Sequence, residues 1–521
     1  MRHSSLLLGC AMLCSLTIAA FHPEAQAQEF SYKGSVFSDL HMTIPGTDRP
    51  DDVKAVRFDR SDNTFKFTGS FTMNTVDVVA DLSLTYSGKS DVYQLDTLRS
   101  RSKVDPFYFE SEALYIRISD FIVEGLDLRV GRQIIDWGSA DRFNPTSTIN
   151  GLDLEDYQDF GRRVANEMIN LTYAPGWEVE GSGDTPIFSE FQFQIIWVPR
   201  FRSGLVPESS EYVFGGPDQF RRFAKSRILS NLVDLQELYV KYGGSILYDV
   251  KVHEPDDAIT NSQVGARVGF SLFGVDLNFY YYYGFDHNMQ PRTVNVNAVS
   301  TDPDVSRAVD ANIHLVAGNE AQRKVLMDLM EGFSYEGIST LTAYTDVTVE
   351  YPRIHMAGFD FATSLDALGG LGLWGELAFY VHDDVRIDLD INGTKMNENQ
   401  ADKGFFVKAV VGMDNSFTKW LYVNMQYIYG FVDEFGANDL EHYLMVNADF
   451  KALNEQMLFR LSLVWCISDP SAMLVPNLSF KLWPNTELAV GALLHFGKDD
   501  STFGNRTTGP NYIFMQAKYS F

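Results

Sequence analysis

Alternation of apolar and polar residues with a period of two recurs along almost the whole chain and constrains the fold more than any other feature. In the segment 511–521, one face is apolar throughout: Ile513, Met515, Ala517, Tyr519 and Phe521. The opposite face carries Gln516, Lys518 and Ser520. Successive side chains of a strand point to opposite faces, so this pattern predicts a strand with one apolar and one polar face.

Segments with this pattern number about twenty, and we predict roughly 18 to 20 strands. The segments with the pattern lie at 30–42, 64–74, 76–87, 112–124, 126–138, 162–175, 188–200, 235–247, 262–274, 275–287, 338–350, 353–366, 371–383, 403–416, 419–431, 441–452, 456–467, 472–482, 485–496 and 511–521.

The length of these segments and the chain's aromatic content indicate a membrane barrel. Many segments reach about ten residues, the length that crosses a bilayer at a tilt. The chain holds 39 Phe, 25 Tyr and 7 Trp, and aromatic residues such as Trp420, Trp465 and Trp483 fall near predicted strand ends, as in interfacial girdles. Because an open sheet edge cannot be satisfied in lipid, the sheet must close. The predicted fold is an all-β transmembrane antiparallel β-barrel with long external loops.

The N-terminus predicts export. Arg2 and His3 precede an apolar run from Leu6 to Ala20, and Ala25-Gln26-Ala27 forms a small-x-small cleavage site. We therefore expect a signal peptide at 1–27 and a barrel at 28–521, in the outer membrane of a Gram-negative bacterium. Cleavage after Ala27 leaves Cys466 as the only cysteine, which excludes an internal disulfide. A lipoprotein site at Cys10 is disfavoured by the short apolar run before it.

The final strand ends on Phe521, and a terminal amphipathic strand with a C-terminal Phe resembles the signal by which bacterial outer-membrane barrels are recognised for assembly. The resemblance implies the barrel-assembly machinery as a partner, beside outer-membrane lipids and lipopolysaccharide. The formal net charge of −27 argues against nucleic acid, because phosphate binding needs clustered Lys and Arg.

The most distinctive motif is Val130-Gly131-Arg132-Gln133, continued by Asp136-Trp137-Gly138 and, further on, by Asn144-Pro145 and Asp153-Leu154. Glu350-Tyr351-Pro352-Arg353 and Trp374-Gly375-Glu376 follow later. Together these motifs resemble an uncharacterised porin-like family of outer-membrane barrels, known as a domain of unknown function and distantly similar to alginate-export-type channels. The resemblance spans most of the mature chain and implies a pore or uptake channel.

Strict alternation in the motif strand places Asp127 and Arg129 in the lumen and Arg132 toward lipid. An Arg at the bilayer midplane costs about 2–4 kcal/mol, and less near the interface. Either a bulge near Gly131 turns Arg132 into the lumen, or Arg132 lies at the rim; we favour the bulge.

The strand end and the following loop carry charges of both signs, which we take as candidates for a pore constriction: Arg129, Arg132, Asp136, Asp141, Arg142, Asp153, Arg162 and Arg163. Glu155 and Asp156 lie in the same stretch. A charged loop folded inward sorts solutes by size and charge, but the same charges can also pin the loop to the wall. Both roles stay open. Arg267 and Glu376 are further candidates, and Lys408, Arg460, Lys481 and Lys518 also fall on predicted lumenal faces.

Catalytic chemistry finds no support in the sequence. The eight histidines after residue 27 are scattered, and there is no Gly-x-Ser-x-Gly elbow, His-Glu-x-x-His motif or glycine-rich phosphate loop. We therefore expect no enzyme, no cofactor and no metal.

Twenty strands with both termini periplasmic would place 288–337 on the periplasmic side, where so long a connection is unusual. This conflict indicates a miscounted strand. The segment from Arg307 to Met330 has helical composition and is compatible with a loop helix or a plug.

The predicted function is a porin-like channel for diffusion of small solutes, with a small-molecule solute as its partner. The alternatives are a substrate-specific transporter for a polymer or a hydrophobic compound, and a non-conducting structural or adhesion barrel.

Overall fold

The computed structural model describes residues 28–521 apart from 45–55, 91, 93–96, 156–159, 182–185, 207–220, 222–223, 242, 499–500, 505–509 and most of 313–339. The predicted signal peptide, Asp156 and part of the segment from Arg307 to Met330 therefore lie outside the described residues, while Arg307 to Asn312 belong to a helix.

Eighteen of the 23 strands in the described part of the chain form one antiparallel sheet. They are β1 (Gln28–Thr43), β2 (Arg57–Met73), β3 (Val76–Ser87), β4 (Phe107–Ile118), β5 (Leu126–Gln133), β6 (Asn166–Tyr173), β7 (Phe188–Val198), β9 (Gln263–Leu272), β10 (Val275–Phe285), β13 (Arg353–Leu365), β14 (Leu371–His382), β17 (Gly404–Thr418), β18 (Leu421–Tyr429), β19 (His442–Ala452), β20 (Met457–Cys466), β21 (Ser471–Trp483), β22 (Thr486–Phe496) and β23 (Tyr512–Ser520).

The sheet closes into a barrel because its first and last strands pair. Positions 35–43 of β1 align with 520–512 of β23, and Gly34 and Phe521 exchange two backbone hydrogen bonds of 2.9 Å. Closure removes the sheet edges, as a strand in lipid requires. The prediction of a closed antiparallel transmembrane barrel is confirmed, and the strand number is 18.

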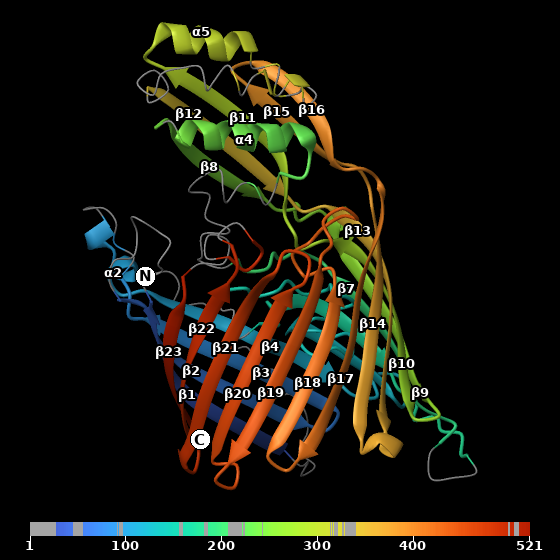
Figure 1. Ribbon diagram of the computed structural model, residues 1–521. Helices are drawn as coiled ribbons and strands as arrows, with labels where there is room; N and C mark the ends of the chain where they lie inside the picture. The colour runs from blue at the N-terminus through green and yellow to red at the C-terminus, as the bar shows by residue number, and fades with distance from the viewer. Residues whose placement is uncertain are drawn as a thin grey trace.

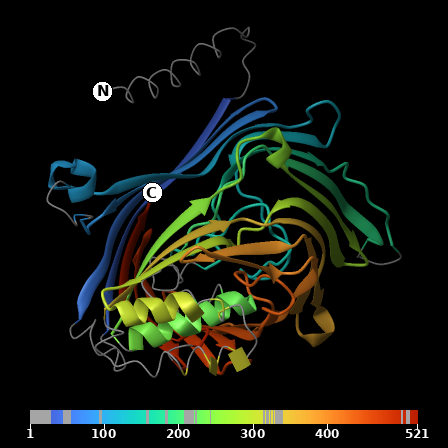
Figure 2. The ribbon, with the colours of Figure 1, turned by 90° about the horizontal axis from the view of Figure 1, so that it is seen from above.

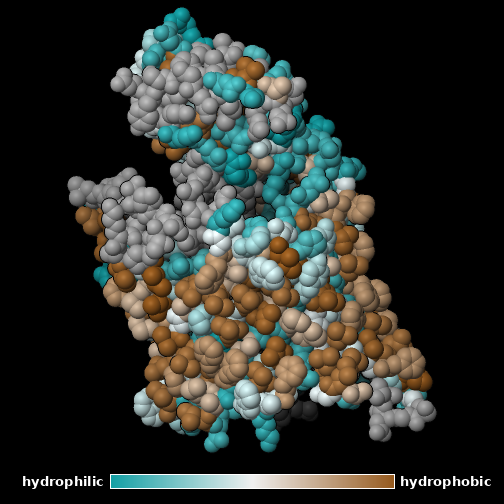
Figure 3. All heavy atoms as spheres, in the orientation of Figure 1, coloured by the Kyte–Doolittle hydropathy of each residue, from teal (hydrophilic) through white to brown (hydrophobic). Residues whose placement is uncertain are grey.

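The outer wall of the barrel is apolar. Figure 3 shows a broad hydrophobic band across the visible face of the barrel, below a more hydrophilic upper part. Phe65 on β2, Phe379 on β14 and Val490 on β22 expose 46%, 44% and 42% of their surface. The polar residues that alternate with them face inward, as Thr64 and Glu376 do. The period of two thus separates a lipid-facing surface from a polar interior.

The five remaining strands form a separate sheet, in the order β16-β15-β11-β12-β8. Its strands are β8 (Ser245–His253), β11 (Gln290–Ser300), β12 (Leu341–Glu350), β15 (Val385–Ile391) and β16 (Thr394–Ala401). The connections between β7 and β9, β10 and β13, and β14 and β17 each supply part of it. It stands above the end of the barrel from which these connections leave (Figure 1).

Helices cover one face of this second sheet. They are α4 (Arg227–Lys241) and α5 (Pro303–Asn312), both seen above the barrel in Figure 2. Leu229 and Val233 of α4 are fully buried and share a core with Val294 of β11 and Val347 of β12. The other helices that the structure describes in full are short: α2 (Arg101–Val104) and the 3-10 turns η1 (Thr97–Arg99), η4 (Ile259–Asn261) and η6 (Asp366–Leu368). None of the described helices is long and apolar enough to cross a membrane.

Two predicted barrel strands are wrong. The segment 235–247 contains the end of α4 and the start of β8, and 338–350 contains β12, which pairs with β8 and β11 in the second sheet. Removing both from the predicted twenty leaves the eighteen observed. The connection 286–352 then leaves the barrel at the same end as the other long connections, which resolves the conflict over 288–337. We call this end the long-connection end.

Candidate functional site

The connection from β5 to β6, residues 134–165, folds into the barrel, and we call it the inward loop. It is anchored first near its root. The Trp137 indole donates to Gln194 Oε1 on β7 at 2.9 Å, and the Gly138 amide donates to the Tyr280 hydroxyl on β10 at 3.1 Å. The indole is 2% exposed and packs on the Tyr280 ring at 5.0 Å. A large aromatic side chain inside the barrel thus fixes where the loop departs from the wall.

The loop is pinned to β14 by Glu376. This carboxylate is 3% exposed and accepts hydrogen bonds from the Ala140 amide at 2.6 Å, Asn144 Nδ2 at 2.9 Å and Thr146 Oγ1 at 2.9 Å. The Thr146 amide adds a longer contact of 3.4 Å. A buried charge is tolerated where hydrogen bonds satisfy it, and here the donors all come from the loop. Glu376 therefore has a structural pinning role.

Gly138 makes this close approach possible. Its φ is +96°, and a Cβ at this position would lie 2.3 Å from Glu376 Oε1. The Trp-Gly corner seen in the sequence thus combines a left-handed turn with a contact that only glycine allows.

The tip of the loop reaches the wall on β18. The Gln426 side chain accepts from the Asp141 amide at 3.3 Å and donates to the Asp141 carbonyl at 3.0 Å. The side chains of Asp141 and Arg142 are exposed, and both line a cavity of about 940 Å³ inside the barrel. Of the predicted constriction residues, these two lie at the tip of the loop.

Charges of both signs line this inner cavity. Nine lining side chains are acidic: Asp39, Asp62, Glu110, Glu112, Asp141, Asp153, Glu155, Asp414 and Asp449. Six are basic: Arg60, Lys66, Arg142, Arg162, Arg460 and Lys518. Several form pairs, such as Arg460 with Asp449 at 2.6 Å and Lys66 with Glu112 at 2.6 Å. The interior is polar and carries an excess of negative charge.

The returning arm of the loop is held by ion pairs. Arg162 pairs with Glu110 on β4 and lies 3.5 Å from Asp153 of the same loop. Burial lowers the pKa of Arg162, but Glu110 and Asp153 outweigh it and raise the pKa above its usual value. Arg163 is 6% exposed, donates to the carbonyls of Ser147 and Asn150, and lies 3.7 Å from the exposed Asp136.

The remaining predicted residues lie elsewhere. Arg129 faces inward on β5 and lies 5.9 Å from the Tyr115 ring, and Arg267 of β9 donates to Asn278 at 2.8 Å. Arg132 lies on the outer face near the end of β5. It aligns with the exposed Leu114, donates to the Ser111 carbonyl at 2.6 Å and lies 3.3 Å from Glu167.

The expected bulge at Gly131 is absent. The pairing of β5 with both described neighbours, β4 and β6, runs through Gly131 and Arg132 without a register shift. Alternation therefore continues, and Arg132 lies at the rim of the barrel, where water and Glu167 satisfy its charge at low cost.

The inward loop separates the inner cavity from a second one. Leu152 and Leu154 line a pocket of about 300 Å³ toward the long-connection end, while the alternating Asp153 and Glu155 line the inner cavity. Phe143, 3% exposed, stacks on Phe160 at 4.4 Å beside this outer pocket. One extended segment thus presents leucines to one compartment and carboxylates to the other.

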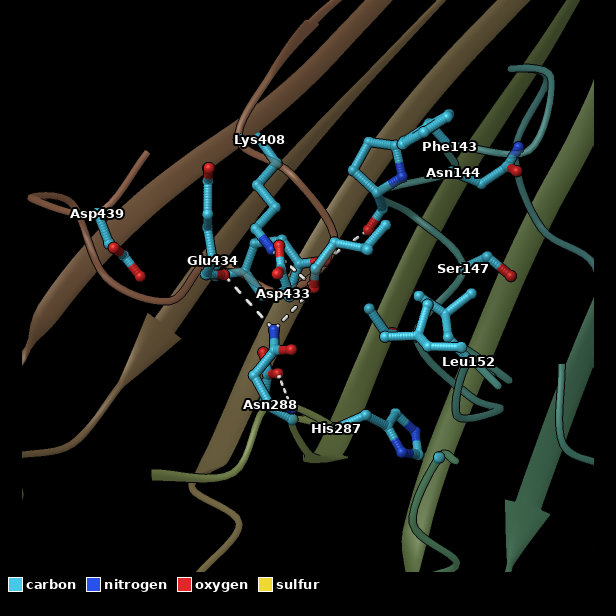
Figure 4. A pocket seen from close by; sticks show the side chains of 18 of the residues that line it. Phe143, Asn144, Ser147, Leu152, His287, Asn288, Lys408, Asp433, Glu434 and Asp439 are labelled. Carbon is cyan, nitrogen blue, oxygen red and sulfur yellow. Dashed lines mark hydrogen bonds between the residues drawn. The ribbon is translucent and has the colours of Figure 1, made fainter. Parts of the chain in front are cut away.

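The connection between β18 and β19 forms the opposite side of the outer pocket (Figure 4). Asp433, Glu434 and Asp439 come from it, facing Phe143 and Leu152 of the loop. Lys408 donates to the Phe431 carbonyl at 2.7 Å. Glu434 accepts from the Tyr443 hydroxyl and from two backbone amides. Burial, with Asp433 nearby, raises the pKa of Glu434 to about 7.

His287 forms another part of the pocket wall, and burial lowers its pKa to about 4, with Arg163 adding to the shift, so it is neutral at pH 7. Sequence reasoning missed His287, Glu434 and Trp137 as parts of the lumen. Each follows a barrel strand by only a few residues, and the sequence does not show which side chains of the connections enter the lumen.

No group of three or more His, Cys, Asp or Glu side chains among the described residues is arranged to hold a metal ion. The polar residues around the loop are engaged in pinning it and in lining the two compartments. A charged loop held inside a polar barrel can sort molecules by size and charge.

Comparison with known proteins gives the family. A family model described as "Protein of unknown function (DUF1302)" matches residues 114–435, and this chain belongs to that family. A comparison with curated proteins finds no match.

Similar solved structures are porins and related channels. OmpF of Salmonella typhi, in complex with daunomycin, is 10% identical, with 94% of this chain and 97% of that chain covered and a TM-score of 0.34. OccAB2 of Acinetobacter baumannii is 8% identical, with coverage of 95% and 98% and a TM-score of 0.44. OccAB3 of the same organism is 10% identical, with coverage of 95% and 99% and a TM-score of 0.43. With TM-scores below 0.5, these structures carry no argument about this chain.

Proposed function

We propose that this chain is an outer-membrane channel of a Gram-negative bacterium, through which small polar solutes diffuse. The apolar outer wall supports the membrane location, and Trp420, Trp465 and Trp483, exposed at strand ends, fit an interfacial girdle. The long connections and the second sheet then lie outside the cell, in contact with lipopolysaccharide. The short turns between strands, at the opposite end of the barrel, then face the periplasm.

The observation that carries the proposal is the inward loop. It enters the lumen from β5 and is bonded to β14 and β18. Its tip presents Asp141 and Arg142 to a charged cavity of about 940 Å³. A rigid loop inside a polar barrel narrows the passage and gives it a charge preference. A purely structural barrel has no need of a pinned, charged loop in its interior.

The pairing of the first and last strands, which closes the barrel, bears on how the barrel is assembled in the membrane. Phe521 pairs with Gly34, and its ring packs directly on this glycine. A Cβ placed on Gly34 would lie 2.4 Å from the nearest carbon of the Phe521 ring. We propose that the barrel-assembly machinery recognises the final strand before this seam closes.

The test is single-channel conductance of the refolded protein in a planar bilayer. We expect stable open steps whose ion preference shifts when Arg142 is replaced by alanine, because Arg142 lies at the loop tip. A correctly folded barrel that stays silent would overturn the diffusion channel and favour a gated transporter or a structural barrel.

A further inference from the structure

The outer pocket differs in chemistry from the cavity beneath it. The inner cavity has a polar wall, whereas the outer pocket is lined on the loop side by Phe143, Leu152 and Leu154 and on the wall side by Val410 and Ile428. Its volume of about 300 Å³ matches the lower end of small-molecule sites, enough for one substituted aromatic ring. Apolar side chains around such a space favour a ligand with an apolar body, since its transfer from water is favourable.

Carboxylates of the β18–β19 connection give the pocket its charge. Asp433, Glu434, Asp439 and Glu441 line it, together with Asp286. Three basic side chains also line the pocket, so five acidic residues face three basic ones. Lys408 donates to the Phe431 carbonyl, Lys225 pairs with Asp439, and Arg163 donates to two loop carbonyls.

Titration of buried carboxyls reduces the negative charge of the pocket. Burial raises the pKa of Glu434 to about 7, so this carboxyl is partly protonated at neutral pH, and His287 contributes no charge. Burial also raises the pKa of Asp286, and Asp439 is paired with Lys225, so the negative potential depends mainly on Asp433 and Glu441. Both ring nitrogens of His287 are buried at the pocket wall and have no hydrogen-bond partner of normal geometry among the described residues.

We propose that the outer pocket is a recognition site for small organic cations with an apolar body, which it binds before they enter the charged cavity below. An ammonium group would lie toward Asp433 and Glu441, and the apolar body would lie against Leu152, Leu154 and Phe143. This site rests on the proposed channel function, since it selects the solutes that the channel passes. The acidic excess of the inner cavity continues the same charge preference along the pathway.

Three probes separate the two parts of the proposal: phenethylammonium, phenylacetate and ethylammonium. The first two share a ring and differ in charge, while the third keeps the charge without the ring. Each is titrated against the potassium current through single channels. We expect phenethylammonium to interrupt the current at concentrations about tenfold or more below those of the other two, because only it gains from both burial and charge.

Variants locate the site. Asp433→Asn combined with Glu441→Gln is expected to raise the half-blocking concentration of phenethylammonium by roughly threefold for each charge removed. Leu152→Asn weakens the same probe through loss of apolar contact and leaves ethylammonium unchanged. Asp249→Asn, which removes one carboxylate from the exposed strand β8, is the matched control and has no effect.

Isothermal titration calorimetry with the same probes on the detergent-folded barrel needs no open pore. If the protein binds phenethylammonium but conducts no current, the pocket proposal stands and only the proposed diffusion channel is overturned. Equal binding of phenylacetate, or an unchanged affinity in the double variant, would overturn the pocket proposal while leaving the channel intact.

Discussion

Releasing the inward loop from Glu376 is the most informative perturbation of this barrel. In Glu376→Ala the Ala140 amide, Asn144 Nδ2 and Thr146 Oγ1 each lose an acceptor at 2.6–2.9 Å. Hydrogen bonds to a charged group contribute about 1.5–3 kcal/mol each, so three at the lower limit give about 4.5 kcal/mol. Water in the lumen replaces part of this, leaving about 2–3 kcal/mol, or roughly a 30- to 150-fold shift toward the undocked loop.

Single-channel recording and hydrogen exchange measure this shift. We expect Glu376→Ala to give larger and noisier conductance steps, and the Ala140 and Thr146 amides to exchange faster by a similar factor. Asp449→Ala is the control, because Asp449 also lines the inner cavity but pairs with Arg460 on the wall. Conductance and exchange that stay at wild-type values in Glu376→Ala would refute the pinning role.

Three further predictions follow from individual contacts. Gly138→Ala would place an alanine at a φ of +96° with its Cβ 2.3 Å from Glu376 Oε1, so the loop should undock much as in Glu376→Ala. A wild-type conductance in this variant would contradict the expectation. Arg132→Ala should leave ion selectivity, measured as the reversal potential in a KCl gradient, unchanged, because Arg132 lies on the outer face; a shift would place it in the pathway. Glu434→Gln should remove a pH dependence of the β18–β19 connection.

The stability of the closed β18–β19 connection should fall as the pH rises. Burial raises the pKa of Glu434 from 4.5 to about 7, so the folded connection binds a proton more tightly than the open one does. The closed connection is therefore most stable below pH 4.5, loses stability between 4.5 and 7, and levels off above, over a range of about 3 kcal/mol. Exchange of the Phe431 and Glu441 amides, corrected for intrinsic rates, reports this opening. A slope that persists in Glu434→Gln would assign it to another group.

Alternation predicted the barrel but not the second sheet, for a physical reason. On β12 the alternating Leu341, Ala343 and Val347 are fully buried, while Tyr344 between them is 48% exposed. Alternation with a period of two shows that one face of a strand is apolar. It does not show whether lipid or a helix covers that face. The covering helix α4 buries Leu229, Leu232 and their neighbours at helical spacing, a signal overlooked at 227–241.

The candidate site was predictable only in part. The sequence placed Glu376 on an inward face and a charged loop after Gly138, but the bonds between them join residues more than 200 positions apart. No local pattern encodes such a partner. At Arg132 the sequence allowed a bulge or a rim position, and β5 ends one residue later, at Gln133, which places the side chain at the rim.

The proposed channel function depends on whether the tip of the inward loop lies in the conducting path. Asp141→Cys introduces a thiol at the exposed tip, and Cys466, the native cysteine of the described residues, is fully buried and should not react. A positively charged methanethiosulfonate is added during single-channel recording. The control is Ser38→Cys, at a residue that is bonded to Asn63 on the outer face of β1, since its neighbours Phe37 and Asp39 line the inner cavity. We expect a discrete fall in conductance for Asp141→Cys alone. Complete labelling by mass with an unchanged current would contradict it.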